Sequence, residues 1–453
     1  MYYKKYVKGS KKESRGDKKE VEIIRKGSDY LEPIMGELSQ QIDKRLTYTF
    51  FDTFFGILSH RDQINGLLLS ELGGYINGPE HAPAGTKRLS NLLACEGWDD
   101  KLLQDQLLKK NQQRLSKKGE EGKRWLLHWD DSVIEKPESF RTEGLCAVVS
   151  SKASRLTRIK PGYYKKIGRI SVPGYEWSAC VLSSLQDPPA ICLMNWWTKR
   201  GKHAEQKDNI LYRMLQSSSE MIKQTQAEVW HIFDRGYANF TTLNYMINHF
   251  EQQFIVRWKS NHKLINQNGI SKNTYRHSLG KKATTTRFLW DKERKENRKV
   301  SLVHMLVRHP EEELNSKQLY LVIARDGIKG RKPIYFLTDV KVDTNGMAWS
   351  IVLSYMRRWD VEQIFRFGKT AMGIESPRLW FFDRTLKLLS FVTLIMDFLF
   401  SLIAQHRSFA RTLIDKWCPR TGNRQRKTSL PIYRLRLAVS LILLYRLNPF
   451  FDT

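Results

Sequence analysis

The spacing of apolar residues predicts a helical region at the start of the chain. Between about residues 31 and 120, apolar positions recur at helical intervals in short segments such as LSQQIDKRLTYTFFDTFFGILS and DDKLLQDQLLKK. Breaks rich in Gly and Pro, such as NGPEHAPAG, separate these segments. We therefore expect a compact helical domain over residues 31–120, built from several amphipathic helices.

From residue 121 the pattern changes to short apolar strands that alternate with helices. WLLHWDDS, EVWHIFDRG and QFIVRWK read as buried strands, and WSACVLSSL and AICLMNWWT, joined by QDPP, read as a β-hairpin. Helices are expected at about 203–226 and 237–251. Three strands in a meander followed by helix, strand, helix and strand is the order of an RNase H-like α/β core, and we assign its first part to residues 121–259.

Residues 260–345 interrupt the alternation of strands and helices. Four apolar segments here predict antiparallel strands: TTTRFLW, KVSLVHMLVRH, LYLVIARD and KPIYFLTDV. We interpret this segment as a β-rich insertion, followed by the second part of the core at 346–405 and a C-terminal helical region at 406–453. The apolar stretch 386–404 is long enough for a membrane span, but it carries Lys387 and Asp397. The stretch 435–447 is too short to span, so we expect buried helices and no membrane.

Charge indicates the kind of partner. Lys and Arg number 76 against 47 acids, a net charge of +29, which implies a polyanionic partner. With this charge, the helical domain is expected to bind DNA, and residues 1–30 are expected to form a disordered basic arm. The five cysteines form no C-x-x-C pair, which argues against structural zinc and disulfides and favours the cytoplasm.

Acidic residues end two of the apolar strands and lie on a later helix. Asp130 and Asp131 follow the first strand, Asp234 follows the fourth, and Glu362 lies in the helical segment after the insertion. Phosphodiester chemistry with two Mg²⁺ ions needs carboxylates that converge from separate elements, and Mn²⁺ is an alternative ion. Because side chains alternate along a strand, only one of the first pair should face the site, and we prefer Asp130.

The segment YMRRWDVEQIFRFGKT, residues 355–370, places Tyr355, Arg358, Glu362 and Lys369 at offsets of 0, 3, 7 and 14. On a continuous helix these residues fall within a sector of roughly 60°, with Arg366 beside them. Such a face suits one metal-binding acid among cations that follow DNA phosphates. A solvated face with an Arg358–Glu362 ion pair is the alternative on geometry alone.

These residues resemble the DDE transposases of bacterial insertion sequences that carry the Y-R-E-K signature, Y-x2-R-x3-E-x6-K. DDS at 130–132 and FDRGYAN at 233–239 look like the first- and second-aspartate motifs of that family. The resemblance implies a transposase with Asp130, Asp234 and Glu362 at the metal site. It implies double-stranded DNA partners, the terminal inverted repeats and the target, a homodimer in the synaptic complex, and a bacterial, nucleoid-associated location.

In that family the tyrosine, arginine and lysine of the signature hold phosphates near the cleaved end. Two further residues are candidates for DNA contact. Arg257, on the strand before the insertion, is a candidate for the active-site face. Trp290, in the insertion, could stack on an extrahelical base, although a core tryptophan is at least as reasonable.

Three other functions remain open. A metal-dependent nuclease with an RNase H-like core would need the acids but not the Tyr, Arg and Lys. A DNA-binding protein derived from a transposase would have lost catalysis, which the intact acids argue against. A recombinase with a covalent tyrosine would cleave in EDTA, but the sequence contains no R…H-x-x-R constellation to support it.

Overall fold

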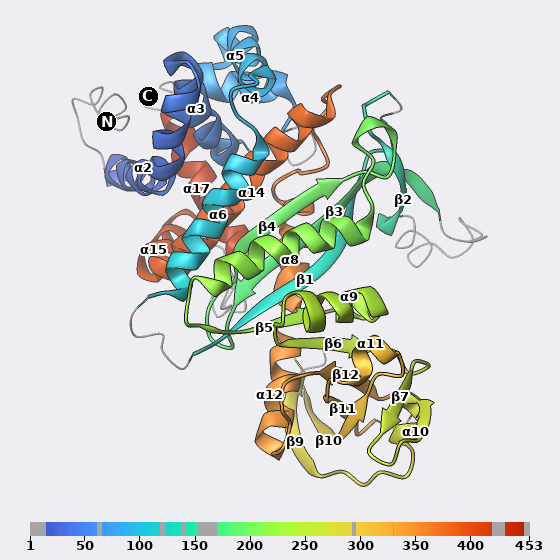
Figure 1. Cartoon of the computed structure of the whole chain (residues 1–453). Helices are drawn as coiled ribbons and strands as arrows, with labels where there is room; N and C mark the ends of the chain where they lie inside the picture. The colour runs from blue at the N-terminus through green and yellow to red at the C-terminus, as the bar shows by residue number, and fades with distance from the viewer. Residues whose placement is uncertain are drawn as a thin grey trace, which may run out of the picture.

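A twelve-stranded mixed sheet runs through the part of the chain that the structure describes (Figure 1). The structure is a computed structural model, and it describes residues 15–60, 66–117, 123–137, 139, 141–152, 170–291, 296–328, 330–418 and 431–447. The first fourteen residues of the predicted basic arm lie outside these ranges.

The first half of the sheet has the strand order predicted for an RNase H-like core. Its strands are β1 (Arg124–Glu135), β2 (Cys146–Val149), β3 (Ser171–Ser183), β4 (Ala190–Trp197), β5 (Glu228–Phe233) and β6 (Phe254–Trp258). β1 pairs antiparallel with β3 and parallel with β5, β5 pairs parallel with β6, and β4 lies on the far side of β3. The predicted α/β fold, with helices at both ends of the chain, is confirmed.

Helices cover both faces of this core. On one face, alternate residues of β1, Trp125, Leu127 and Trp129, pack in a cluster that includes α8 (Lys207–Lys223) and α9 (Phe240–Asn244). On the other face lie α12 (Asn345–Met356) and α13 (Trp359–Thr370), whose apolar residues join clusters with Leu126 and Ile134. The helix expected at 237–251 is divided into a 3-10 turn (Arg235–Tyr237), α9 and a π-helical turn (Tyr245–His249).

The insertion extends the same sheet. Its elements are β7 (Lys263–Asn266), β8 (Ser271–Asn273), α10 (Thr274–Ser278), β9 (Thr285–Asp291), β10 (Glu296–Arg308), α11 (Glu312–Asn315), β11 (Leu319–Asp326) and β12 (Ile334–Thr338). β12 pairs antiparallel with β6, and β11 and β10 follow it outward. The four strands that the sequence predicted here are present, and the chain returns to the core directly beside β6.

The N-terminal helices begin earlier than expected. They are α2 (Arg15–Gln41), α3 (Lys44–Ser59), α4 (Leu69–Asn77), a 3-10 turn (Pro79–His81), α5 (Ala82–Ala94) and α6 (Asp100–Leu115). The prediction of a disordered arm to residue 30 is therefore wrong from Arg15 onward, because Ile23 and Ile24 are buried with Leu31 in the helical core. Basic residues of α2 also pack, since Lys19 and Lys26 each lie about 5 Å from the Phe409 ring.

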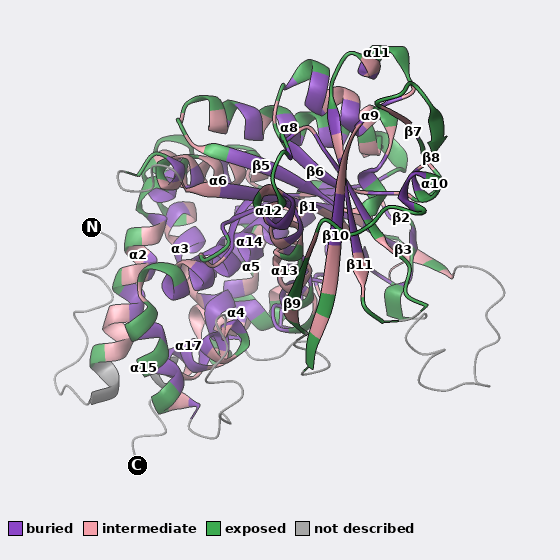
Figure 2. Cartoon of the chain, turned by 90° about the horizontal axis from the view of Figure 1, so that it is seen from below, coloured by how far each residue is buried: buried purple, intermediate pink, exposed green. Residues whose placement is uncertain are grey.

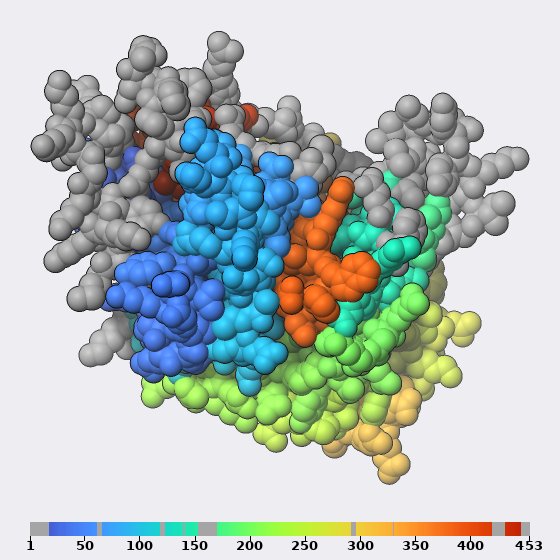
Figure 3. All heavy atoms as spheres, turned by 90° about the horizontal axis from the view of Figure 1, so that it is seen from above, coloured from blue at the N-terminus to red at the C-terminus, as the bar shows by residue number. Residues whose placement is uncertain are grey.

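The C-terminal helices complete the core of the N-terminal helices. They are α14 (Phe382–Gln405), α15 (Arg407–Trp417) and α17 (Ile432–Leu447), and α14 packs against α3, α6, α17 and β4. α14 is the one described helix long and apolar enough to cross a membrane, but most of it is buried inside the protein. In Figure 3 orange atoms, from about residues 370–390, lie between the blue N-terminal region and the teal and green atoms of the core.

A buried carboxylate joins three of these elements. Asp397 of α14 is 1% exposed and forms an ion pair with Lys110 of α6. It also accepts hydrogen bonds from the Tyr30 hydroxyl at 2.8 Å and from the Ile191 backbone N–H at 3.1 Å. Because a buried charge must be paired and hydrogen-bonded, Asp397 fixes α2, α6 and β4 around α14. Figure 2 shows α14 and the central strands β1, β5 and β6 buried through most of their length.

Candidate active site

Two of the predicted acids lie on neighbouring parallel strands. β1 and β5 pair in parallel, with Trp129 opposite Phe233. Asp130 directly follows Trp129, and Asp234 directly follows Phe233. β5 ends at Phe233, so Asp234 begins the 3-10 turn that follows. The two side chains therefore meet at the end of the β1–β5 pairing.

Asp130 and Asp131 point to opposite faces of the sheet. The Asp130 carboxylate lies 2.7 Å from Arg358 at the start of α13. Asp131 instead accepts a hydrogen bond from the Ser178 hydroxyl at 2.7 Å and forms an ion pair with Lys207 of α8 at 2.5 Å. Strand alternation thus places Asp130, the residue preferred from the sequence, on the same face as α13.

The signature segment is two helices and not one. α12 ends at Met356 and α13 begins at Trp359, with Arg357 and Arg358 in the turn between them. The N–H groups of Arg358 and Asp360 bond to the carbonyls three residues earlier, a tighter pattern than an α-helix. The prediction of one continuous helical face is therefore wrong, and Tyr355 and Glu362 converge on Arg358 from two different helices.

The Arg358 side chain lies among all three predicted carboxylates. Its Nη1 is 2.7 Å from Asp130 Oδ2, its Nη2 is 2.5 Å from Glu362 Oε1, and its Nε is 3.8 Å from Asp234 Oδ1. The side chain is only 13% exposed. Burial disfavours its charge, but Tyr355 and the three carboxylates raise the pKa of Arg358 above the ordinary value of arginine. Arg358 is therefore a permanent cation at the centre of an acidic cluster.

Tyr355 holds the second aspartate. Its hydroxyl donates a hydrogen bond of 2.9 Å to Asp234 Oδ1. Burial, followed by the nearby Asp234 charge, raises the pKa of Tyr355 far above its ordinary value, so the phenol stays protonated at neutral pH. The positive charge of Arg257, on β6, acts to lower the pKa of Tyr355, so Arg257 lies beside the cluster.

The environment of Asp130 makes its ionisation unfavourable. Burial raises the pKa of this carboxyl to about 7, Arg358 acts to lower it, and Asp234 adds to the increase. A carboxyl with a pKa near neutrality sits at the boundary between its protonated and charged forms. Perturbations of this kind are typical of functional sites.

The remaining predicted residues lie farther along α13 and on the insertion. Lys369 is half-buried in the last turn of α13, and Arg366 is exposed on the same helix. Trp290 lies on β9 and is 56% exposed, so it is not a core tryptophan. Within the described residues, no contact joins Trp290 to the three carboxylates.

The chemistry of this cluster suits a divalent cation. Asp130, Asp234 and Glu362 offer hard carboxylate oxygens, the ligands that Mg²⁺ prefers. In the arrangement seen here the Arg358 guanidinium lies among the three carboxylates, and the described residues contain no group of three His, Cys, Asp or Glu side chains gathered closely enough to hold one ion. The residues fit the ion by type, and their approach to a shared ion requires Arg358 to move.

Sequence reasoning missed the residues that position this site. Arg357 donates a hydrogen bond of 2.7 Å to the Asp187 carbonyl in the β3–β4 turn and lies 2.7 Å from Asp360, which stabilises the break between α12 and α13. Lys207, which forms an ion pair with Asp131 on the opposite face of the sheet, was also missed. Arg357 and Asp187 are 170 positions apart in the chain, and Lys207 and Asp131 are 76 apart, so no local pattern indicates these contacts.

Residues 75–331 match the family model described as DDE superfamily endonuclease. The match covers more than half of the chain, including β1 and β5 with Asp130 and Asp234. A search of the curated proteins found no match.

Proposed function

The chain belongs to the DDE superfamily endonucleases, and on this premise we propose that it is a transposase of the insertion-sequence group with the Y-R-E-K signature. The proposed enzyme binds the terminal inverted repeats of its element and cleaves the DNA there. It then joins the freed 3′-hydroxyl to target DNA, working as a homodimer in the synaptic complex. Endonucleases of this superfamily use divalent metal ions.

The observation that supports this proposal best is the convergence on Arg358. Three acids from separate segments, Asp130, Asp234 and Glu362, all approach one guanidinium at distances of 2.5 to 3.8 Å. In the proposal these acids hold two Mg²⁺ ions, with Mn²⁺ as a substitute. Such ions activate the attacking oxygen and stabilise the leaving oxygen.

Arg358 has two sets of partners in this proposal. Without DNA its positive charge lies among the three carboxylates and reduces their mutual repulsion. With DNA bound, the guanidinium can form two parallel hydrogen bonds to a phosphate beside the scissile bond. Arg358 would then move away from the three carboxylates, which would be free to hold the metal ions. Tyr355 would keep its hydrogen bond to Asp234.

The other cations hold DNA around this centre. Lys369 and Arg366 extend along α13 from Glu362, and Arg257 lies beside Tyr355. We assign these three residues to phosphate contacts, which position a strand without reading its sequence. The exposed indole of Trp290 is assigned to stacking on an unpaired base.

Single-turnover cleavage of a labelled terminal-repeat duplex tests the proposal. Asp130→Ala, Asp234→Ala and Glu362→Ala should each abolish cleavage in Mg²⁺ while leaving binding of the duplex largely intact. Asp131→Ala is the matched control, because this neighbouring acid faces α8, and it should retain most activity. Cleavage at the wild-type rate by any of the first three variants would remove that residue from the site.

Strand transfer separates the transposase from a simple nuclease. A pre-cleaved end with a free 3′-hydroxyl should join to a plasmid in the presence of the wild-type protein and Mg²⁺. Cleavage without joining would support the nuclease alternative, and specific binding without either reaction would support a non-catalytic DNA-binding protein. Cleavage in EDTA through a trapped protein–DNA adduct would refute metal chemistry altogether.

A further inference from the structure

A basic cleft lies between α6 and α14 and is bordered by the β3–β4 turn. Its volume is about 330 Å³, and its walls are the second half of α6, the start of β1, the turn at Asp187–Pro189 and the end of α14. A second hollow of about 250 Å³ shares Asp187, Pro188, Pro189 and Ala404 and reaches Arg357 and Asp360. We call the two hollows together the α6–α14 cleft.

The cleft carries more positive charge than its own acids neutralise. Six cations line it, and its three carboxylates each have a cation already: Asp397 pairs with Lys110, Asp187 with Lys123, and Asp360 with Arg357. The cations that remain are Arg114, Lys117 and Arg407. None of these three has a carboxylate partner within the described part of the chain, so the cleft presents three surplus positive charges.

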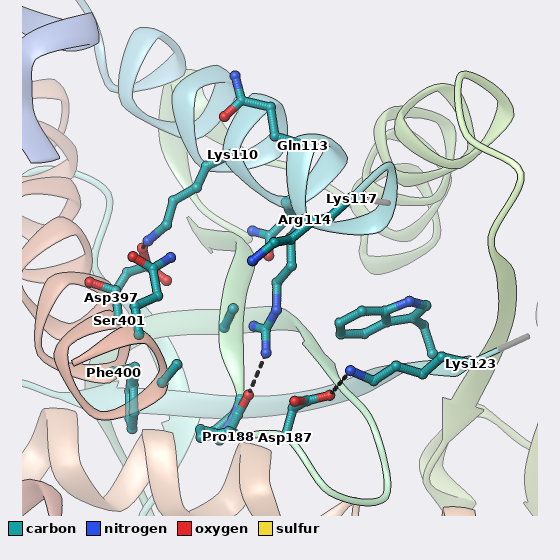
Figure 4. Close-up of a pocket in the computed structure, with 16 residues that line it drawn as sticks. Lys110, Gln113, Arg114, Lys117, Lys123, Asp187, Pro188, Asp397, Phe400 and Ser401 are labelled. Atoms are coloured by element: carbon teal, nitrogen blue, oxygen red, sulfur yellow. Dashed lines mark hydrogen bonds and ion pairs between the residues drawn. The ribbon is translucent and has the colours of Figure 1, made fainter. Parts of the chain in front are cut away.

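The walls hold the cationic groups in position. Figure 4 shows Lys110 reaching from α6 to Asp397, and Arg114 reaching across the cleft to the Pro188 carbonyl. The Arg114 guanidinium lies 5.1 Å, and the Lys123 amine 4.5 Å, from the centre of the Trp125 ring. The indole N–H of Trp125 is buried and has no hydrogen-bond partner among the described residues.

We propose that the α6–α14 cleft binds the phosphodiester backbone of one strand of the DNA on which the enzyme acts. The cleft is too small for a duplex. Lys110 and Arg114 lie one turn apart on α6, and Lys117 follows two residues after its end. Together they span about 10 Å along the direction of α6, the rise of roughly three nucleotides along a strand. The second hollow ends at Arg357 and Asp360, the residues on either side of Arg358 and Trp359 in the chain. A strand in the cleft is thereby led to the turn that carries Arg358.

This inference rests on the proposed function, because it takes DNA as the substrate. The strand could belong to a duplex end whose backbone lies against the cleft, or to a single strand released from pairing. Both sources offer the same phosphates. Binding measured in EDTA distinguishes them and does not depend on catalysis.

The test uses the full chain and the double variant Lys117→Gln/Arg407→Gln. Both side chains are exposed, so their loss should leave the fold intact, which circular dichroism and thermal unfolding would verify. The matched control is Lys263→Gln/Lys272→Gln, which removes two exposed lysines from β7 and β8 at the other end of the sheet. Fluorescence anisotropy with a labelled duplex and with the matching single strand gives Kd over a range of salt concentrations.

We expect the cleft variant to lose about two phosphate contacts. For duplex DNA the slope of log K against log salt should fall in magnitude by about 1.8, and binding should be about 60-fold weaker near 0.1 M salt. For a single strand the corresponding values are about 1.4 and about 25-fold. Weakening with either DNA supports the proposal and identifies the source of the strand, while the control should change little.

A photocrosslinking amino acid at Gln405, which lines the cleft, should capture DNA in the wild-type background, and one at Lys263 should not. Unchanged affinity and salt slope for both DNAs in the cleft variant would overturn the proposal, as would the absence of crosslinks at Gln405. If the cleft variant binds normally while the carboxylate variants are inactive, only the cleft is refuted. If the carboxylate variants cleave normally but the cleft variant binds weakly, the proposed active site is refuted and the cleft stands.

Discussion

Replacing Asp130 by Asn should stabilise the protein in alkaline solution while it abolishes cleavage. Asp130 is mostly buried, and burial raises its pKa from an ordinary 3.8 to about 7. The folded state therefore holds the proton more tightly than the unfolded state does. The contribution of Asp130 to the free energy of unfolding is therefore fully present at acidic pH, and it is lost as the pH rises from about 4 to about 7. Asn has nearly the shape of the protonated acid and cannot ionise.

The size of the effect follows from the pKa difference. A shift of about three units corresponds to about 4 kcal/mol once both states are ionised. Asp130→Asn should thus raise the free energy of unfolding by about 2 kcal/mol at pH 5 and by about 4 kcal/mol at pH 8.5. Urea unfolding in EDTA at the two pH values measures the difference.

Asp131→Asn is the control for this experiment. Asp131 pairs with Lys207, which is 42% exposed, so its loss should cost about 0–1 kcal/mol with no gain at alkaline pH. Mg²⁺ should stabilise the wild type by mass action and should have a smaller effect on Asp130→Asn. If Asp130→Asn is less stable than the wild type at pH 8.5, attraction to Arg358 outweighs the cost of burial and the reasoning fails.

Two further predictions concern single contacts. Tyr355→Phe removes the 2.9 Å hydrogen bond to the Asp234 carboxylate, about 1.5–3 kcal/mol for a bond to a charged acceptor. It should slow single-turnover cleavage by roughly 13- to 160-fold. A covalent protein–DNA adduct in the wild type, with complete loss of activity in the folded variant, would instead make Tyr355 a nucleophile. Asp397→Ala leaves Lys110 and the Ile191 N–H without their buried acceptor, and it should lower the free energy of unfolding by about 3–5 kcal/mol. Urea unfolding measures this difference. A decrease below about 1 kcal/mol, the range of a surface ion pair, would contradict the role assigned to Asp397.

The sequence predicted those features that depend on local pattern. Alternating apolar strands ending in acids were enough to order β1, β3, β4, β5 and β6 and to place Asp130 and Asp234 at neighbouring strand ends. Strand alternation was enough to distinguish Asp130 from Asp131. These properties follow from the two-residue period of a strand and from the rules of chain connection.

Features that depend on distant partners were missed. The break at Arg357 contains neither Gly nor Pro, and it is stabilised by the Asp187 carbonyl on another hairpin. Residues 15–30 look like a charged arm because their burial depends on contacts such as that of Lys19 and Lys26 with Phe409, nearly 400 positions away. The contacts of the three acids with Arg358 likewise could not be predicted, because they depend on how distant segments of the chain pack together.

The burial of α14 among the N-terminal helices has a consequence for the newly made chain on the ribosome. Tyr30 and its acceptor Asp397 are separated by 367 residues. At about 5–20 residues per second, roughly 20–70 s pass between their synthesis. During this interval α2, α3 and α6 are made in turn without the helix that covers their apolar faces, and Glu362 is made 128 residues after Asp234. The nascent polypeptide therefore lacks the full set of three acids until Glu362 has been made, and it exposes apolar surface prone to aggregation until α14 has been made.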